Sequence, residues 1–473
     1  MTDRGTCEGR DWRGVRVTVM GLGLFGGGAG VARYLAERGA RVLVTDLRSE
    51  EALRPSLEQL HDLPITFHLG EHCERDFTET ELVVVNPAVK EDSPYLRAAR
   101  ESGVALETEI NLFFRLCPAP ILGVTGSVGK TTTTSMIGHI LGCSGRRVHV
   151  GGNIGCSLLL NVEKIRPDDI VVVELSSFQL RRLSWTRRSP AISVVTNLHP
   201  NHLDNHPTLE EYAQCKKRIL AYQRPGDTAV LNADDPLVSQ WGEECRGSVL
   251  YFGLQDTGAP GAFARDRQIA LRDAAGVHRV CACNEMPLPG VHNVANALAA
   301  AAACAAAGLS PQEIANGLRT VQPVPHRLEP VGEWGGVRYY NDSKATTPQS
   351  TLTALAAFDR PIILIAGGSS KGFKYGEFAR RAVQYLKAAV LLGQTAPELA
   401  AAIRQADAVG RVTTRTASSL EEAVREASRL STAGDVVLLS PTTASYDMFL
   451  NYEKRGECFK ECVRRLGEPL PRP

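Results

Sequence analysis

The sequence lacks the charge excess that is typical of nucleic-acid-binding proteins and the long apolar runs that are typical of membrane proteins. It carries 53 Lys and Arg against 52 Asp and Glu, so we expect no nucleic-acid partner. Its longest apolar stretch, residues 295–309, is alanine-rich and shorter than the ~20 residues that span a bilayer. We therefore predict a packed helix there and no membrane insertion. Residues 1–14 contain no apolar segment of a secretory signal, which indicates a cytoplasmic protein.

The twelve cysteines lack the paired spacing of a zinc site. Cys281 and Cys283 are separated by one residue, which is too close for a C-x-x-C pair. We interpret the cysteines as reduced, buried thiols of a cytoplasmic protein. The chain also shows no internal repeat and no low-complexity tail. The balanced composition that remains fits an enzyme that acts on small molecules.

What the chain does contain is three successive series of short apolar runs that alternate with amphipathic stretches. This alternation is typical of α/β folds with parallel sheets. A length of 473 residues fits about three domains of ~150 residues each. Proline-marked segments at 117–120 and 321–329 indicate the joints. We predict domains at 1–117, 118–322 and 323–473, and a last helix from about Tyr446.

A phosphate-binding loop is predicted at residues 123–134, which read GVTGSVGKTTTT. Gly126 and Gly129 would let the backbone wrap phosphates, Lys130 would reach the β and γ oxygens, and the Thr131 hydroxyl would meet Mg²⁺. The loop is shorter than the full G-x-x-x-x-G-K-[ST] pattern. An ordinary glycine-rich turn is the alternative, but the lysine followed by four threonines favours nucleotide binding.

A second glycine pattern lies near the N-terminus. Gly21, Gly23 and Gly26 form G-x-G-x-x-G after a predicted strand, and Asp46 ends the next strand. This spacing is the dinucleotide fingerprint of NAD enzymes, but the same geometry holds any pyrophosphate with its ribose or uracil. Hydride transfer needs no ATP, so the phosphate loop disfavours a dehydrogenase, which remains the alternative from a different class.

Metal ligands are expected after two strands of the central series. Glu174 ends the apolar run IVVVE, where its carboxylate can reach Mg²⁺ beside Thr131. The next run leads into a cluster formed by His199, His202, Asp204 and His206. Zinc would need further matching spacings that the cluster does not supply. We expect one histidine near Mg²⁺ instead.

A set of motifs that covers nearly the whole chain resembles the Mur ligase family. They are TGSVGKTTTT, GGNIG, ELSSFQL, NHLDNH, YAQCKKRI, LNADD, GVHNVANALAAA, PHRLE, YNDSKATTP and LLSPTTASYDMF. The segments MGLGLFGGGAGVARYLAERGARVLVTD and LLSPTTASYDMFLNYEKRGECF are most similar to the branch that adds D-glutamate. The DNP signature of the diaminopimelate-adding branch is missing.

The resemblance implies an α/β fold with a Rossmann-like domain for the UDP substrate, a central P-loop ATPase-like domain and a Rossmann-like domain for the amino acid. The implied reaction is the ATP-driven addition of D-glutamate to UDP-N-acetylmuramoyl-L-alanine through an acyl phosphate, in peptidoglycan precursor synthesis. It requires two Mg²⁺ ions, and a monomer is expected. Other Mur-type branches and folylpolyglutamate synthase are the alternatives within ligases.

The resemblance also assigns roles to individual residues. Catalytic roles fall on Lys130, Asn153, His202 and Lys216. Mg²⁺ contacts fall on Thr131, Glu174, His202 and Lys216. Nucleotide contacts fall on Gly126, Ser127, Gly129, Lys130, Thr131, Thr132, Asn293, Asn296, Arg327, Asp342 and Lys344. Substrate contacts fall on Asp46 and Arg48 for the uridine nucleotide and on Thr346, Lys371, Ser445 and Tyr452 for D-glutamate.

Several of these residues also have purely structural interpretations. Asn293 and Asn296 would then cap the alanine-rich helix, Asp342 would form an Asx turn, and Arg48 and Lys371 would be solvated charges. Two positions depart from the family pattern. Val128 stands where a polar residue is usual, and Tyr452 stands where phenylalanine is expected.

Lys216 corresponds to the family lysine that reacts with CO₂ to form a carbamate. Adjacent helical residues are about 100° apart, so only one of Lys216 and Lys217 can face the site. A carbamate supplies the anionic oxygens that Mg²⁺ prefers, whereas a plain lysine repels the ions. Two solvated lysines on an exposed helix are the alternative.

Overall fold

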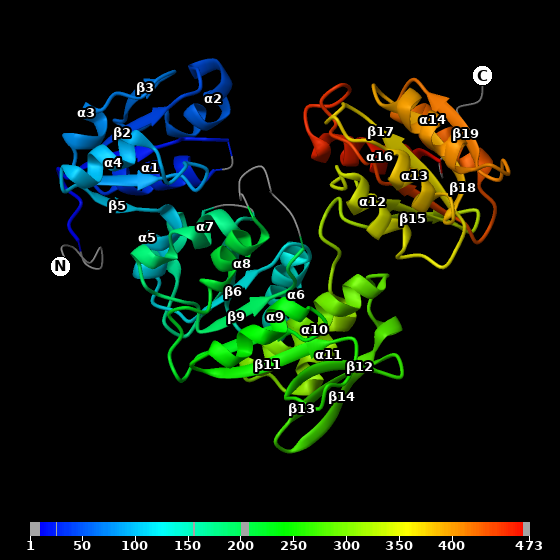
Figure 1. Ribbon diagram of the computed structural model, residues 1–473, viewed down its shortest axis with the longest axis horizontal. Coiled ribbons are helices and arrows are strands. Elements are labelled where there is room, and N and C mark those ends of the chain that lie inside the picture. The colour runs from blue at the N-terminus through cyan, green and yellow to red at the C-terminus, as the bar shows by residue number, and fades with distance from the viewer. Residues whose placement is uncertain (1–9, 25, 155–156, 200–207, 467–473) are drawn as a thin grey trace. The chain divides into compact units, whose positions relative to one another are not determined.

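The structure is a computed structural model that describes residues 10–24, 26–154, 157–199 and 208–466. Its internal contacts divide the chain into two compact units. The first comprises Met1–Cys283 with Ala295–Leu318, and the second comprises Asn284–Val294 with Arg319–Pro473. Two sheets lie in the first unit and one in the second (Figure 1). The three sheets match the three predicted α/β series, while the exact domain boundaries stay a prediction.

The first sheet is wholly parallel, with the strand order β3-β2-β1-β4-β5. Its strands are β1 Arg16–Met20, β2 Arg41–Asp46, β3 Thr66–Leu69, β4 Leu82–Val85 and β5 Ala105–Glu107. Its helices are α1 Gly27–Glu37, α2 Glu50–Leu57, η1 Glu58–Leu60, α3 Arg75–Thr78 and α4 Pro94–Glu101. The glycine-rich turn follows β1, Asp46 ends β2 and Asn86 follows β4, so all three lie at the carboxyl edge of adjacent strands.

The central sheet has nine strands in the order β14-β13-β12-β11-β10-β9-β6-β8-β7. They are β6 Ile121–Thr125, β7 Val148–Gly152, β8 Ile170–Glu174, β9 Ile192–Val195, β10 Thr228–Asn232, β11 Ser248–Gly253, β12 Gly261–Arg265, β13 Gln268–Asp273 and β14 Gly276–Ala282. The accompanying helices are α5 Glu109–Leu116, α6 Lys130–Cys143, η2 Leu158–Lys164, α7 Ser177–Arg181, η3 Leu183–Trp185, α8 Leu209–Lys217, α9 Pro236–Gln240, η4 Trp241–Glu244, η5 Cys283–Glu285, α10 Val291–Ala306 and α11 Pro311–Thr320.

The prediction of a purely parallel central sheet is wrong at one edge. Strands β12, β13 and β14 pair antiparallel with one another. Asp266 and Arg267, the two residues between β12 and β13, have φ angles of 50° and 59°. Two consecutive positive φ angles make the tight turn of a β-hairpin, and a link this short cannot carry a parallel crossover. The predicted alanine-rich helix is confirmed as α10, in which Ala297–Cys304 are fully buried.

The sheet of the second unit has the order β15-β16-β20-β17-β18-β19. Its strands are β15 Glu329–Trp334, β16 Val337–Asn341, β17 Ile362–Gly367, β18 Leu386–Leu392, β19 Thr413–Ala417 and β20 Val436–Leu439. Its helices are α12 Pro348–Leu355, α13 Gly376–Ala382, α14 Ala396–Ala406, α15 Leu420–Leu430 and α16 Tyr452–Arg465. Only β15 runs antiparallel to its neighbour among the described strands of this sheet.

The last helix begins six residues later than predicted, at Tyr452 rather than at Tyr446. Asn451 caps it, because its side chain accepts a hydrogen bond from the backbone N–H of Lys454 at 2.8 Å. The residues between Ser440 and Asn451 therefore form a loop after β20. This loop carries Ser445, one of the predicted substrate contacts.

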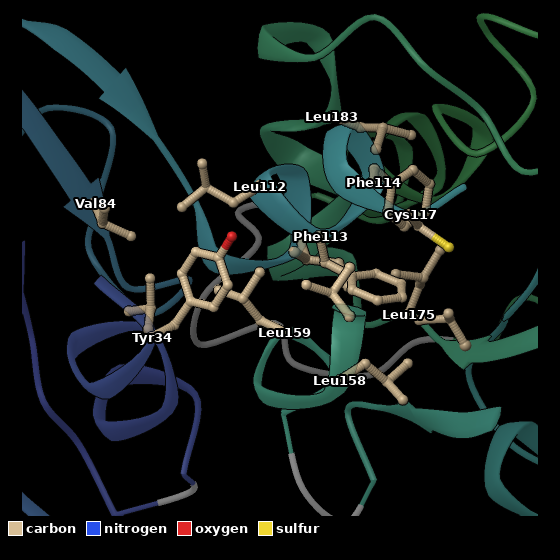
Figure 2. Packing of buried hydrophobic residues seen from close by; sticks show 14 of the residues in the cluster. Tyr34, Val84, Leu112, Phe113, Phe114, Cys117, Leu158, Leu159, Leu175 and Leu183 are labelled. Carbon is tan, nitrogen blue, oxygen red and sulfur yellow. The ribbon is translucent and has the colours of Figure 1, made fainter. Parts of the chain in front are cut away.

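A shared core joins the first two sheets within the first unit. Tyr34 of α1, Phe113 of α5 and Leu159 of η2 are buried in one cluster, and their helices contact one another (Figure 2). Burying side chains of this size stabilises a fold by about 1.5–3 kcal/mol each. The cluster fixes α1, which follows the glycine-rich turn, against the segment that follows β7 of the central sheet.

The cysteines only partly fit the prediction of buried thiols. The ten described cysteines are all free. Five of them are buried, namely Cys117, Cys215, Cys281, Cys304 and Cys462, whereas Cys143 is exposed and the others are half-buried. Within the described ranges, no helix combines the length and the apolar character needed to cross a membrane.

Candidate active site

The predicted phosphate loop connects β6 to α6, with Lys130 as the first helical residue. Gly126 has a φ angle of +145°, and a Cβ atom there would lie 1.9 Å from the Thr196 hydroxyl oxygen. Gly129 precedes the helix with a φ angle of +87°. Both positions require glycine, because side chains rarely adopt these angles. The loop therefore leaves the backbone N–H groups of a 14-residue helix open to an anion.

Two residues that we did not single out in the sequence brace this loop. Asn197 accepts a hydrogen bond from the Val128 N–H and donates one to the Val128 carbonyl, both at 2.9 Å. The Thr196 hydroxyl also donates to the Val128 carbonyl, at 2.6 Å. Val128 itself is 49% exposed at the loop tip. Its backbone, not its side chain, holds the loop in shape.

Lys130 and the first threonines of α6 lie around the loop. The Lys130 Nζ donates to the carbonyl oxygens of Gly126 and Ser127, each at 3.0 Å. Thr131 is half-buried and Thr132 is buried in the first turn of α6. The Ser127 hydroxyl is held by the His199 backbone at 2.9–3.0 Å, and it donates to the Tyr212 hydroxyl at 3.2 Å.

Glu174 ends β8, next to β6, and its side chain is buried at 2% exposure. Its Oε1 accepts a hydrogen bond from the Asn153 side-chain amide at 2.8 Å. Its Oε2 is buried and has no hydrogen-bond partner among the described residues. A buried carboxylate oxygen without a partner is costly, and a hard cation compensates it. The donor set therefore fits Mg²⁺ beside the loop.

The two neighbouring lysines of α8 have different surroundings, as the helical period predicts. Lys216 is 1% exposed, and its Nζ donates to the Gly126 carbonyl at 2.7 Å and lies 4.5 Å from the centre of the Tyr212 ring. Lys217 pairs with Glu244 at 2.5 Å. Burial, followed by repulsion from Lys130, lowers the pKa of Lys216 to about 6.

The two asparagines predicted to lie on the adenine side, Asn293 and Asn296, are in the N-terminal part of α10. Asn296 accepts a hydrogen bond from the Thr133 hydroxyl at 3.4 Å, and a Cβ atom on Gly129 would come within 2.4 Å of its Oδ1. Asn293 is 5% exposed and donates to the Pro289 carbonyl at 2.7 Å. The contacts of Asn296 place it directly against the phosphate loop. The hydrogen bond from Asn293 to Pro289 fits the interpretation of Asn293 as a helix cap and also that of a nucleotide contact.

The histidine cluster is described only at its first member. His202, Asp204 and His206 lie outside the described residues, so the structure does not test them. Over the described ranges, no group of three or more His, Cys, Asp or Glu side chains forms a metal site.

Asp46 lies where the dinucleotide fingerprint predicts it. Asp46 is 7% exposed, and its carboxylate accepts hydrogen bonds from the backbone N–H groups of Gly23 at 3.1 Å and Arg48 at 2.9 Å. Arg48 is exposed, which fits both a nucleotide contact and a solvated charge. The carboxylate thus ties the glycine-rich turn after β1 to the end of β2.

A second cluster lies at the carboxyl edge of β16 in the second unit. Asp342 accepts hydrogen bonds from the Ser440 hydroxyl at 2.9 Å and the Leu328 N–H at 3.2 Å. Burial raises the pKa of Asp342 to about 7. The Arg327 Nε is buried with no hydrogen-bond partner among the described residues. The Lys344 Nζ lies 5.5 Å from the centre of the Tyr452 ring.

Three of the residues predicted to bind D-glutamate lie on loops after the adjacent strands β16, β17 and β20, namely Thr346, Lys371 and Ser445. The fourth, Tyr452, is the first residue of α16. The Lys371 Nζ donates to the Thr346 hydroxyl at 3.2 Å. Ser445 is buried at 3% exposure. Arg455, which the sequence did not single out, is 2% exposed and donates to backbone carbonyls on two of these loops. Burial, followed by repulsion from Arg455, lowers the pKa of Lys371.

Comparison with known proteins assigns the class of this fold. Family models described as "Mur ligase MurD-like, N-terminal domain", "Mur ligase middle domain" and "Mur ligase, glutamate ligase domain" match residues 15–107, 124–304 and 326–443. The chain belongs to the Mur ligase family. Two similar relatives are both named UDP-N-acetylmuramoylalanine–D-glutamate ligase. The protein from Roseiflexus sp. is 44% identical, covering 95% of this chain and 98% of the relative, and that from Symbiobacterium thermophilum is 42% identical, covering 96% and 98%.

Solved structures agree on the fold. UDP-N-acetylmuramate–alanine ligase from Thermotoga maritima matches with a TM-score of 0.60 at 20% identity, covering 95% of this chain and 99% of that one. A pseudomurein peptide ligase from Methanothermus fervidus matches with a TM-score of 0.56 at 21% identity, covering 95% and 100%. At these identities the likeness concerns architecture alone.

Proposed function

We propose that this chain is an ATP-dependent ligase that joins D-glutamate to UDP-N-acetylmuramoyl-L-alanine. The observation that carries the proposal is the convergence of Lys130 and Lys216 on the Gly126 carbonyl of a phosphate loop beside the buried Glu174. The names of relatives that are 37–44% identical over nearly the full chain support the choice of amino acid.

The reaction has two steps that both gather negative charge. The carboxylate of the UDP-sugar attacks the γ-phosphate of ATP, which yields an acyl phosphate and releases ADP. The amine of D-glutamate then attacks the acyl carbon, loses a proton and expels phosphate, which leaves an amide. Lys130 and the backbone N–H groups in the first turn of α6 would stabilise this charge, because the loop that positions them is braced before any ligand binds.

Mg²⁺ fits the donor set on the central sheet. The unpartnered Oε2 of Glu174 and the Thr131 hydroxyl would hold one ion, which would neutralise negative charge on the phosphate groups. A second ion would be held by His202 and by a carbamate on Lys216. The carbamate forms when the neutral amine of Lys216 attacks CO₂ and releases a proton, and the buried position of that amine favours its neutral form.

The remaining contacts divide between the substrates. Asp46 and Arg48 would hold the uridine nucleotide, while Thr346, Lys371, Ser445 and Tyr452 would line the D-glutamate pocket. Further nucleotide contacts would come from Asn293, Asn296, Arg327, Asp342 and Lys344. We also propose that the enzyme is cytoplasmic and monomeric. Cell fractionation tests its location, and light scattering tests its oligomeric state.

Phosphate release tests the proposal directly. ADP and phosphate should form only when ATP, UDP-N-acetylmuramoyl-L-alanine and D-glutamate are all present. A panel of amino acids in the same assay separates D-glutamate addition from the other Mur-type and folylpolyglutamate-type activities. Turnover of NAD(H) without ATP would instead support a dehydrogenase and overturn the proposal.

A further inference from the structure

Arg182 is a buried cation that reaches from the central sheet to a loop of the first sheet. It follows α7, the helix after the strand of Glu174, and its side chain is 1% exposed. Its Nη1 donates to the carbonyl oxygens of Asn86 and Pro87 at 3.3 and 3.4 Å. Its Nη2 donates to that of Val89 at 2.5 Å. One guanidinium therefore holds three carbonyl groups of a single loop.

The other contacts of Arg182 keep its guanidinium in place. Glu91, five residues after the first carbonyl that Arg182 holds, forms an ion pair with the Arg182 Nε at 2.9 Å. The guanidinium lies 5.4 Å from the centre of the Trp185 ring. The Arg182 backbone carbonyl accepts a hydrogen bond from the Asn111 side chain at 2.9 Å. Removing a partner from a buried charge is costly, so the Arg182 guanidinium resists displacement from these contacts.

The loop that Arg182 holds is in turn attached to the glycine-rich turn. The Asn86 side chain donates to the Gly21 carbonyl at 3.1 Å and packs so closely that a Cβ on Gly21 would lie 2.8 Å from the Asn86 Cβ. The Gly23 N–H, two residues on, donates to Asp46. A continuous chain of contacts thus leads from Arg182 to Asp46.

We propose that Arg182 is a positioning residue that sets the affinity for the UDP-sugar by holding residues 86–89 against the central sheet. The inference rests on the proposed function, since it takes Asp46 and the glycine-rich turn as the uridine site. Arg182 acts through the loop rather than on a reacting atom. Its loss therefore affects the UDP-sugar and leaves the phosphate loop, which is braced separately by Thr196 and Asn197, unchanged.

The principal test is Arg182→Lys, which keeps the charge but cannot donate to three carbonyl groups at once. The KM for UDP-N-acetylmuramoyl-L-alanine should rise about tenfold or more, while the KM for ATP stays within about twofold. Equal changes in both constants, or no change in either, would overturn the inference.

Arg188→Lys is the matched control. Arg188 also donates to backbone carbonyls that are distant in sequence, those of Phe114 at 2.8 Å and Arg115 at 3.2 Å, but these lie at the end of α5 and not in residues 86–89. It should leave both KM values unchanged. If Arg188→Lys raised the KM for the UDP-sugar as much as Arg182→Lys does, general loosening of the domain packing would explain both and the inference would fall.

Glu91→Gln keeps the inference testable if Arg182→Lys folds poorly. The Glu91 side chain is 43% exposed, so the variant should fold, yet it removes the carboxylate charge that pairs with Arg182. In Glu91→Gln the KM for UDP-N-acetylmuramoyl-L-alanine should rise about threefold, and an unchanged KM would contradict the inference. Wild-type protein in the same assay reports on the proposed function separately, because its failure to release phosphate would overturn the ligase and not the role of Arg182.

Discussion

The Nζ of Lys216 donates a hydrogen bond to the carbonyl oxygen of Gly126 at 2.7 Å. The Lys130 Nζ donates to the same oxygen at 3.0 Å. Two lysines thus converge on one neutral acceptor, and Lys216 is excluded from solvent. This arrangement destabilises the charged form of Lys216, so its amine, rather than that of Lys217, would be available for the proposed reaction with CO₂.

We expect Lys216→Ala to lower ligation at least 100-fold, because it removes the anion that would balance the second Mg²⁺. Lys217→Ala, which breaks an ion pair with Glu244, should retain most activity. Added acetate should partly restore the Lys216 variant by occupying the vacated anion position. Phosphate release measured with and without acetate checks all three expectations. Ordinary activity of Lys216→Ala in carbonate-free buffer would refute the carbamate.

Gly126→Ala should abolish ATP binding. The new methyl group would lie 1.9 Å from the Thr196 hydroxyl oxygen at a φ angle that side chains rarely adopt, so the loop has to move. Gly142→Ala in α6 is the control, because a Cβ there meets nothing within 4 Å and alanine favours a helix by about 0.5–1 kcal/mol. Calorimetric titration with a non-hydrolysable ATP analogue distinguishes the two, and normal binding by Gly126→Ala would contradict this account of the loop.

Much of the site could be predicted because the signals are local. The end of an apolar run placed Glu174. The resemblance to the Mur ligase family selected Lys216, and the helical period predicted that only one of Lys216 and Lys217 faces the site. The contacts that hold the phosphate loop in shape could not be predicted, because Asn197 and Val128 are 69 positions apart in the sequence. An arginine in a sequence is usually exposed, so nothing local marked Arg182 or Arg455 as buried. Both become recognisable only when the carbonyl groups around them are known.

The antiparallel edge of the central sheet also could not be predicted from local sequence signals. Short apolar runs predicted strands but not their direction, and the turn at Asp266 and Arg267 carries no glycine or asparagine to announce a hairpin. Tyr212 is a different case. It lies four residues before Lys216 on the same helix face, so once Lys216 was chosen the helical period was sufficient to find Tyr212 as well.

Asp46→Ala should raise the KM for the UDP-sugar at least tenfold, because two backbone N–H groups of the first domain lose their acceptor. The KM for ATP should stay within about twofold. Asp62→Ala, which breaks a surface ion pair with Arg33, serves as the control and should change neither constant. Calorimetry should detect no NAD binding by wild-type protein. Micromolar NAD binding that Asp46→Ala removes would restore the dehydrogenase.

Lys371→Ala should raise the KM for D-glutamate about tenfold and leave that for ATP nearly unchanged. An ammonium near the buried Arg455 is suited to a carboxylate, since charge-assisted hydrogen bonds are the stronger kind. Lys374→Ala removes an exposed lysine three residues away and should have little effect. Turnover with D-glutamine, D-aspartate and L-glutamate should fall well below that with D-glutamate. Equal turnover with all four would remove this assignment.

The last prediction concerns how stability depends on pH in carbonate-free buffer. The pKa of Lys216 is lowered from 10.5 in the unfolded chain to about 6 in the folded one. Between these values the unfolded state binds the extra proton, so the free energy of unfolding rises with pH, by at most about 1.4 kcal/mol per pH unit. Below pH 6 both states carry the proton, and the full cost of burying the charge remains.

Lys216→Met removes this titration and keeps an apolar side chain in the buried position. Its melting temperature should exceed that of the wild type most at pH 6, and the gap should narrow steadily as the pH rises to 9.5. Lys217→Met changes the neighbouring residue, whose ammonium pairs with Glu244, and should give a curve parallel to the wild type. Scanning calorimetry of the three proteins checks this. A gap between Lys216→Met and the wild type that stays constant from pH 6 to 9.5 would mean that Lys216 does not titrate in this range, and the neutral amine needed for the carbamate would lose its support.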